Sequence, residues 1–281
     1  MRLTSFKIDH HETYGIVTDD GVIDLAQRLG ARYPDLRSVI ADDAIASAAA
    51  YADAPPDHEL SQVTWLPVIP NPEKIICVGI NYLDHRQETA NDESLHPAMF
   101  LRAAQSQTAH RSPIVRPHES DTLDFEGEIA VIIGKAGRRI TRDRAWEHIA
   151  GYSCYNDGSV REFQRHTSQY TAGKNFPSTG AFGPWMVTAD EIPPETTLTL
   201  SCRLNGELMQ QATTDQMIFS IPVIIEYVST VTALQPGDVI VTGTPGGVGS
   251  RRTPPVWMKP GDVVEVSVDK IGVLHNTIVD G

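Results

Sequence analysis

Two glutamates separated by a single glycine stand at the head of an unbroken apolar run, and this arrangement restricts the possible folds more than any other part of the chain. The run, Ile129 to Ile133, is typical of a buried strand. Because residues two apart on a strand share a face, Glu126 and Glu128 project side by side while Phe125 faces the opposite way. Two adjacent carboxylates at the edge of a core repel each other and lose hydration, so the pattern predicts a compensating cation.

The residue types around this pair favour a hard divalent ion. Gly127 leaves room between the glutamates for backbone or ligand to approach closely. A site made of carboxylate oxygens, without cysteine or a close histidine pair, favours Mg²⁺ or Mn²⁺ over zinc. Asp157 is the natural third ligand, because it also ends a strand-like segment, Ile149 to Tyr155. Taken alone, the pair of glutamates is weak evidence for a metal site, because one carboxylate solvated at a strand end gives the same pattern more often.

The composition narrows the class of protein. Of 281 residues, 41% are hydrophobic and 21% charged, and the net charge is −13. A chain of this length can bury one large core, or a main domain and a smaller one, which excludes a disordered or disulfide-stapled protein. The acidic balance argues against binding to nucleic acid or to an anionic membrane, since both need a basic surface. We therefore expect a small-molecule partner.

Other signals predict a cytoplasmic location. Three widely spaced cysteines, Cys77, Cys154 and Cys202, form no CxxC motif, so we expect buried, reduced thiols. The first ten residues interrupt any apolar run with charged and polar side chains, which does not fit a secretory signal. No apolar stretch approaches the roughly 20 residues of a membrane span.

The pattern of apolar residues and turn residues predicts two regions. Residues 1–70 read as a small N-terminal α/β domain, with a hairpin over 14–25 and an Ala-rich helix over 38–53 that Pro55 ends. Residues 71–281 read as the main domain, in which strands outnumber helices and form adjacent pairs. The expected strands are 74–79, 125–134, 198–204, 238–242 and 262–268, and the expected helices are 82–90, 142–150 and 221–231. This order favours an α+β, mainly β fold with a mixed or antiparallel sheet.

A series of motifs carries a family resemblance across residues 72 to 281. In chain order they are Val78-Gly-Ile-Asn-Tyr82, His85 with Glu88, Phe125-Glu-Gly-Glu128 with Asp157, Gly173-Lys174, Gly243-Thr-Pro-Gly-Gly247 and Lys259-Pro-Gly-Asp262. In this combination the chain resembles the fumarylacetoacetate hydrolase family. The resemblance implies a mixed β-sandwich roll with flanking helices, often with a small N-terminal domain and usually as a homodimer. It also implies that Glu126, Glu128 and Asp157 ligate Mg²⁺ or Mn²⁺.

The resemblance also implies catalytic groups. His85 and Glu88 lie three apart on an expected helix, so the carboxylate can orient and charge the imidazole as a general base, although a solvated surface pair has the same spacing. In the family this pair sits on a mobile helical lid and activates water, and the polar segment 89–97 fits a lid that orders on closure. Lys174 is implied to stabilise developing negative charge on the substrate.

Further positions match those that bind substrate in the family. They are Gly79, Asn81, Arg161, Gln164 and Thr244, with Arg165 and His166 as close competitors for the far end of the substrate. The glycine-rich segment 243–249 lacks the Gly-Lys-Ser/Thr ending of a phosphate loop, so a loop that approaches the substrate carboxylate suits it better. Arg102 stands where many relatives carry lysine, which predicts a different pocket beyond the metal.

These inferences predict a metal-dependent hydrolase that cleaves the C–C bond of a 2,4-diketo acid, such as fumarylpyruvate or a diketo-deoxy sugar acid. Pyruvate or another 2-oxo acid would leave through a metal-bound enolate, with a carboxylic acid as the second product. The same enolate chemistry serves oxaloacetate decarboxylation, isomerisation of 2-hydroxyhepta-2,4-diene-1,7-dioate and dehydration of a 2-keto-3-deoxy sugar acid. A non-catalytic metal-containing binding protein and a nucleotide-binding module are more distant alternatives.

Overall fold

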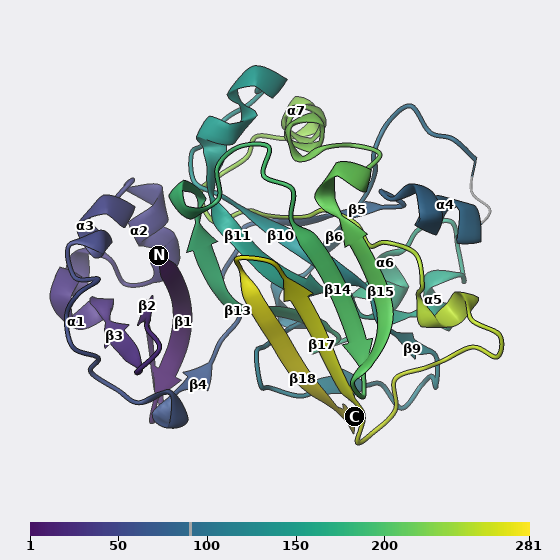
Figure 1. Cartoon of the computed structure of the whole chain (residues 1–281), viewed down its shortest axis with the longest axis horizontal. Coiled ribbons are helices and arrows are strands. Elements are labelled where there is room, and N and C mark those ends of the chain that lie inside the picture. Colours follow the sequence, from purple (N-terminus) through teal and green to yellow (C-terminus); the bar gives the residue numbers. More distant parts are fainter. Residues whose placement is uncertain (90–91) are drawn as a thin grey trace.

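The structure is a computed structural model that describes residues 1–89 and 92–281. Strands dominate it, and helices lie around them (Figure 1). The strands are β1 (Arg2–Ile8), β2 (His11–Val17), β3 (Val22–Asp24), β4 (Thr64–Trp65), β5 (Ile75–Gly79), β6 (Ala98–Arg102), β7 (Gln107–Ala109), β8 (Ile114–Arg116), β9 (Leu123–Asp124), β10 (Gly127–Ile133), β11 (Ile149–Asn156), β12 (Ser159–Val160), β13 (Gly180–Thr188), β14 (Thr199–Leu204), β15 (Glu207–Thr213), β16 (Val239–Val241), β17 (Val263–Val268) and β18 (Gly272–Asp280). The α-helices are α1 (Leu25–Leu29), α2 (Leu36–Ala41), α3 (Ile45–Ala49), α4 (Leu83–Thr89), α5 (Arg161–Gln164), α6 (Thr171–Lys174) and α7 (Ile221–Val231).

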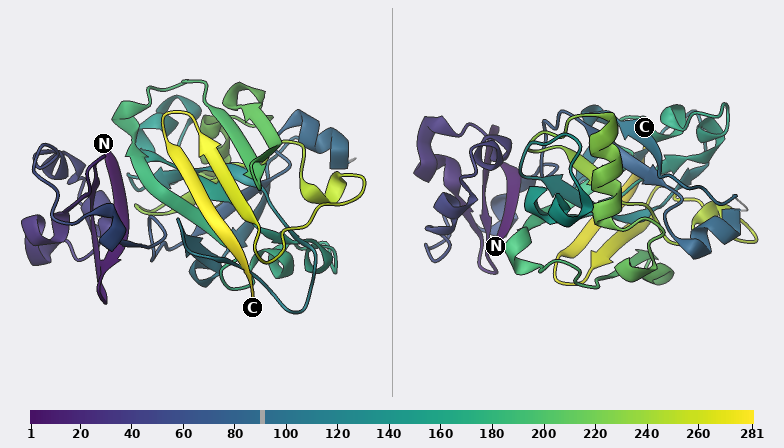
Figure 2. Two further views of the ribbon diagram at one scale, coloured as in Figure 1. Left: turned by 60° about the horizontal axis from the view of Figure 1, so that its bottom comes forward. Right: turned by 90° about the horizontal axis from the view of Figure 1, so that it is seen from above.

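Two large sheets face each other and enclose the core. The larger one runs β3-β2-β1-β13-β11-β10-β16-β5-β6, and the smaller one runs β15-β14-β17-β18-β8. Most neighbouring strands are antiparallel, but β16 and β5 are parallel, so the larger sheet is mixed. Figure 2 shows β17 and β18 as a layer in front of the larger sheet. The expected α+β, mainly β fold is therefore confirmed.

The alternation of side chains along β10 explains how one strand serves both the core and a polar site. Ile129 and Val131 pack with Leu200 of β14 and Val266 of β17 between the two sheets. Glu128 lies on the opposite face of β10 and is buried. The apolar face stabilises the sandwich, while the other face carries the carboxylate into the interior.

The N-terminal region joins the larger sheet. Strand β1 pairs with β13 through Leu3 and Met186, and the hairpin expected over 14–25 forms from β2 and β3. Leu3 shares a hydrophobic cluster with Cys77 and Tyr155, which lie beyond the expected boundary at residue 70. Division of the chain into domains at residue 70 therefore stays a prediction, and in this structure the two parts share a sheet and a cluster.

Local structure departs from the expected elements in two places. The helix expected over 38–53 is two short helices, α2 and α3, because Asp43 adopts a positive φ of 56° between them and breaks the hydrogen-bond ladder. The segment expected as a helix over 142–150 is a 3₁₀ helix, Arg142–His148, whose last residue leads directly into β11. The other expected strands and helices form within a few residues of their predicted ends, apart from residue 90 of the helix expected over 82–90, which lies outside the described residues.

Burial and helix length bear on two further predictions. All three cysteines are free and buried, as expected. No helix among the described residues is both long enough and apolar enough to cross a membrane.

Candidate active site

Strand pairing brings the three predicted metal ligands together. In the β10–β11 register Gly127 faces Asn156, so the residues just outside this pair, Glu126 and Asp157, are adjacent, and the Asp157 amide donates to the Glu126 carbonyl at 2.8 Å. Glu128 follows Glu126 on the same side of the chain. Ligand atoms of the three carboxylates lie within 4.8 Å of one another, and all three residues are buried.

Three cations surround this cluster. The Lys174 ammonium lies 2.5 Å from Glu126 Oε2 and 2.5 Å from Asp157 Oδ2. Arg161 Nη2 lies 2.7 Å from Glu126 Oε1, and Arg102 Nη1 lies 2.5 Å from Asp157 Oδ1. None of the three cations approaches Glu128 as closely among the described residues. Its Oε2 instead accepts a hydrogen bond from the Gly243 amide at 2.5 Å.

Because the cations are unevenly distributed, the pKa values of Glu126 and Glu128 shift in opposite directions. Burial raises the pKa of Glu128 well above its usual range, and the Asp157 and Glu126 charges raise it further. Burial also disfavours ionised Glu126, but Arg161 and Lys174 outweigh it and lower the pKa of Glu126. For Lys174, burial opposes the charged form, yet the Asp157 and Glu126 carboxylates raise its pKa. The cluster therefore carries an excess of negative potential at Glu128.

The residues present fit a divalent metal ion. The donor set is three buried carboxylates, the ligand type that Mg²⁺ and Mn²⁺ prefer. Asp124, whose Oδ2 lies 2.8 Å from Arg161 Nε, adds a fourth carboxylate to the cluster. With all four carboxylates ionised, as metal binding requires, four negative charges against three cations leave one negative charge, and a divalent ion would make the local sum positive. Such a centre would attract an anionic substrate although the whole chain carries −13.

His85 and Glu88 form the pair that the sequence predicts. They lie on α4, and His85 Nδ1 is 2.8 Å from Glu88 Oε1. Glu88 Oε2 also accepts from the Gly247 amide at 2.9 Å. Burial raises the pKa of Glu88, but the hydrogen bonds from His85 and Gly247 outweigh this and lower it, so Glu88 stays ionised near neutral pH. The ionised carboxylate holds the imidazole with Nδ1–H directed at it, which leaves Nε2 as the free acceptor.

The glycine-rich loop organises these carboxylates through its backbone amides. Gly243 has φ of 102°, a conformation that favours glycine, and its amide donates to Glu128. The Gly249 and Ser250 amides donate to Asp124 at 2.8 and 2.9 Å. These donors are therefore engaged by side chains of the protein, which disfavours a nucleotide phosphate on this loop.

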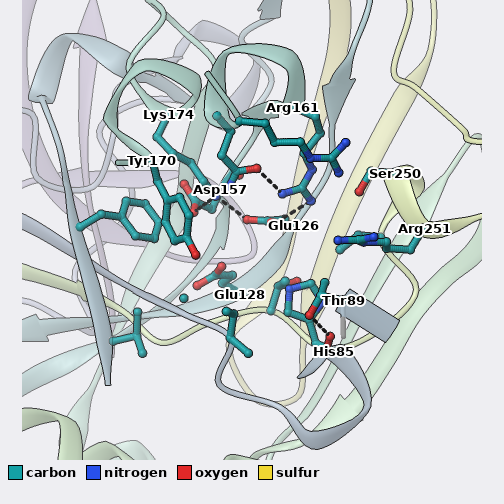
Figure 3. Close-up of a pocket in the computed structure, with 18 of the residues that line it drawn as sticks. His85, Thr89, Glu126, Glu128, Asp157, Arg161, Tyr170, Lys174, Ser250 and Arg251 are labelled. Carbon is teal, nitrogen blue, oxygen red and sulfur yellow. Dashed lines mark hydrogen bonds and ion pairs between the residues drawn. The ribbon is translucent and has the colours of Figure 1, made fainter. Parts of the chain in front are cut away.

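A cavity of about 330 Å³ opens onto the cluster. Figure 3 shows Tyr170 on one side and Arg251 on the other, with the carboxylates between them. Of the predicted site residues the cavity lining includes His85, Glu126, Glu128, Asp157, Lys174, Gly79, Arg161, Gln164 and Thr244. It also includes Arg165 but not His166.

The structure does not bring Asn81 to the cavity wall. Its side chain is fully buried, donates to the Phe219 and Thr242 carbonyls, and accepts from the Phe219 amide. Thr244 lines the cavity, but its hydroxyl donates to the Gly127 carbonyl at 2.9 Å and accepts from Gln210. These contacts favour a supporting position for both side chains, and their roles in binding substrate stay predictions.

Some residues of the site carry little or no signal in the sequence. In the sequence Asp124 is only the residue before the Phe125-Glu-Gly-Glu128 segment. In the structure its carboxylate accepts hydrogen bonds from Arg161 and from the Gly249 amide, and so links Arg161 to the glycine-rich loop. Arg102 stands out only as a departure from relatives, yet it is fully buried against Asp157. Arg251 carries no signal, because only the fold places it across the cavity from Tyr170 (Figure 3). A charged residue beside a buried strand, as at Asp124 and Arg102, is the one signal that could have found them.

Fold, cluster and cavity together define the class of protein. Residues 74–279 match the fumarylacetoacetate (FAA) hydrolase C-terminal family, and the chain belongs to this family of enzymes. It is 41% identical over 221 residues to the mitochondrial oxaloacetate tautomerase fahd2 of Xenopus laevis, covering 78% of this chain and 69% of that one. It is also 41% identical over 226 residues to the oxaloacetate tautomerase YisK of Bacillus subtilis strain 168, covering 79% and 75%.

A solved structure resembles the whole chain. It is the maleylpyruvate hydrolase of Sphingobium sp. SYK-6 in complex with a manganese (II) ion and pyruvate. The identity is 30% and the TM-score 0.83, with 100% of each chain covered. The family holds enzymes of more than one reaction type on this fold.

Proposed function

We propose that the protein is a divalent-metal-dependent enzyme that interconverts the keto and enol forms of a 2-oxo dicarboxylic acid of the oxaloacetate type. The observation that carries the proposal is the buried set Glu126, Glu128 and Asp157, which faces a cavity lined by His85 and Lys174. The 41% identity to two oxaloacetate tautomerases supports the choice of reaction.

The chain's own groups can perform the proton transfer. Tautomerisation moves one proton between C3 and the 2-oxo oxygen and breaks no C–C bond. Mg²⁺ or Mn²⁺ held by the three carboxylates would supply Lewis-acid polarisation of the 2-oxo group. His85 Nε2, left free by the bond from Nδ1 to Glu88, accepts the C3 proton and returns it to the oxygen. Lys174 and Arg161 hold positive charge beside the developing negative charge.

Hydrolysis of a 2,4-diketo acid of the acylpyruvate type is the second candidate. It would use His85, held by Glu88, to deprotonate a water that attacks the C4 carbonyl, and Lys174 to stabilise the oxyanion. The likeness to a maleylpyruvate hydrolase with manganese and pyruvate favours this reaction. Both reactions pass through negative charge on the same 2-oxo acid end, so one site can be tested for both.

The deciding experiment measures two signals with the same metal-loaded protein, namely the loss of the enol form and the release of pyruvate. Enol oxaloacetate is mixed with the Mn²⁺-loaded protein, and loss of the enol absorbance is compared with pyruvate release from oxaloacetate and from a panel of acylpyruvates. Accelerated loss of enol without pyruvate supports tautomerisation, pyruvate from acylpyruvates supports hydrolysis, and pyruvate from oxaloacetate supports decarboxylation. Absence of all three, with tight metal-dependent oxalate binding, would indicate a non-catalytic protein. Glu128→Gln and a chelator serve as controls that should remove every activity.

A further inference from the structure

Two arginines at the cavity come from separate elements of the chain. Arg165 directly follows α5, and Arg251 ends a 3₁₀ helix, Gly249–Arg251, in the loop after the glycine-rich segment. Both side chains line the cavity that holds the three carboxylates, and both residues are exposed. Figure 3 shows Arg251 on the side of the cavity opposite Tyr170, with its side chain directed into the cavity.

These arginines differ from the other cavity cations in their partners. Arg161 directs its guanidinium to Asp124, to Glu126 and to the Gln164 side chain, where Nη1 lies 2.9 Å from Oε1. Lys174 is held between Glu126 and Asp157. Neither Arg165 nor Arg251 forms a side-chain ion pair or hydrogen bond with any residue in the described ranges 1–89 and 92–281.

The unpaired arginines lie close enough to affect one another. Burial lowers the pKa of Arg165, and the neighbouring Arg161 and Arg251 cations lower it further. The Asp124 charge opposes this lowering, but like charges gathered without an ion-pair partner are unfavourable unless an anion binds between them. Guanidinium groups bind carboxylates through two parallel hydrogen bonds, so a ligand carboxylate is the group that best satisfies this pair.

We propose that Arg165 and Arg251 bind the distal carboxylate of the substrate and make the enzyme selective for 2-oxo acids with a second carboxylate. This inference rests on the proposed function for the position of the 2-oxo acid end. That end lies at Glu126, Glu128 and Asp157, and the chain of the substrate runs across the cavity towards the two arginines. Arg161, which the resemblance implies as a ligand for the far end, lies deeper in the cavity, with its Nε donating to Asp124 and its Nη2 2.7 Å from Glu126 Oε1.

The test compares two ligands that differ only in the distal carboxylate. Oxaloacetate, freshly dissolved, and 2-oxobutanoate have the same number of carbons, and both are titrated into Mn²⁺-loaded wild type, Arg165→Gln, Arg251→Gln and the double variant. Since charge-assisted hydrogen bonds are strong, each single substitution should weaken oxaloacetate binding roughly tenfold and the double about a hundredfold. Affinity for 2-oxobutanoate should change less than about twofold. Arg144→Gln, which removes a surface arginine paired with Glu147, is the matched control for loss of one positive charge.

The outcomes separate this inference from the proposed function. If the double variant binds both ligands equally more weakly, or binds both as tightly as wild type does, the arginines do not bind the distal carboxylate and the inference is wrong. If the ratio of affinities changes as expected but wild type fails to accelerate tautomerisation, the subsite stands and the proposed reaction fails. Because both residues are exposed, the variants should unfold at the wild-type temperature, and circular dichroism checks this.

Discussion

The Lys174 ammonium nitrogen lies 2.5 Å from Asp157 Oδ2, so a fully buried cation is bonded directly to a predicted metal ligand. The same nitrogen lies 2.5 Å from Glu126 Oε2. Lys174 therefore bridges two of the three carboxylates, and the third, Glu128, remains without an ion-pair partner among the described residues. This relationship links the electrostatics of the cluster to metal binding.

Lys174→Met should separate catalysis from metal binding. Removal of the ammonium deletes a positive charge beside the reacting end, so turnover should fall by roughly 10²–10³-fold. The same change frees two carboxylates, so Mn²⁺ affinity, measured by calorimetry, should rise. The metal-free variant should be destabilised by about 3–5 kcal/mol because buried charges lose their partner. A weaker affinity for Mn²⁺ in this variant would contradict the electrostatic account.

Glu128→Gln should change how the stability of the metal-free protein depends on pH. The folded state raises the pKa of Glu128 well above its ordinary value of 4.5, so it holds the proton more tightly than the unfolded chain does. This contribution to stability is fully present below pH 4.5 and is lost as the pH rises through the raised folded-state pKa. Urea unfolding at pH 8 should therefore show a more stable variant than wild type, since each tenfold difference in proton affinity between the folded and unfolded states is worth about 1.4 kcal/mol. Equal free energies of unfolding for variant and wild type at pH 8 would show that ionisation of Glu128 does not destabilise the folded protein.

His85→Gln should slow proton transfer strongly and leave the metal site intact. Loss of a positioned general base costs about 10²–10⁴-fold in turnover, whereas the His85 ring is hydrogen-bonded to Glu88 and not to the predicted metal ligands. The turnover of Glu88→Gln should lie between that of His85→Gln and that of wild type, because the imidazole keeps a hydrogen-bond partner but loses the negative charge that orients it. Turnover and Mn²⁺ affinity measured on the same samples check the split. Full turnover in His85→Gln would rule out the pair as the base.

Arg102→Met should test the buried pair on the other side of Asp157. Arg102 Nη1 also donates to the Gly158 carbonyl, and Nη2 donates to Thr179, so the guanidinium ties three segments together. Loss of this cation should destabilise the protein by about 3–5 kcal/mol, measured by urea unfolding, with Arg102→Lys intermediate. Arg203→Met, at an exposed arginine, provides a control that should change stability by less than about 0.5 kcal/mol.

The local sequence was sufficient to predict the strand that carries Glu126 and Glu128, since period-two alternation depends only on neighbouring residues. It was likewise sufficient for α7 and for the spacing of His85 and Glu88, which one helical turn brings together. The prediction of one helix over 38–53 was wrong, because a single positive φ at Asp43 ends α2 before α3 begins in spite of the Ala-rich composition. The resemblance to a family, rather than pattern, supplied the role of Lys174.

The sequence by itself determined the ligand type of the site and the common direction of Glu126 and Glu128 at the start of β10, because residues two apart in an extended chain project to the same side. Only the tertiary structure decided which cations balance them. Lys174, Arg161 and Arg102 reach the cluster from α6, α5 and β6, at distances that no local pattern encodes. The same is true of Arg165 and Arg251, which remain unpaired among the described residues because the fold places them at the cavity and supplies no carboxylate to meet them.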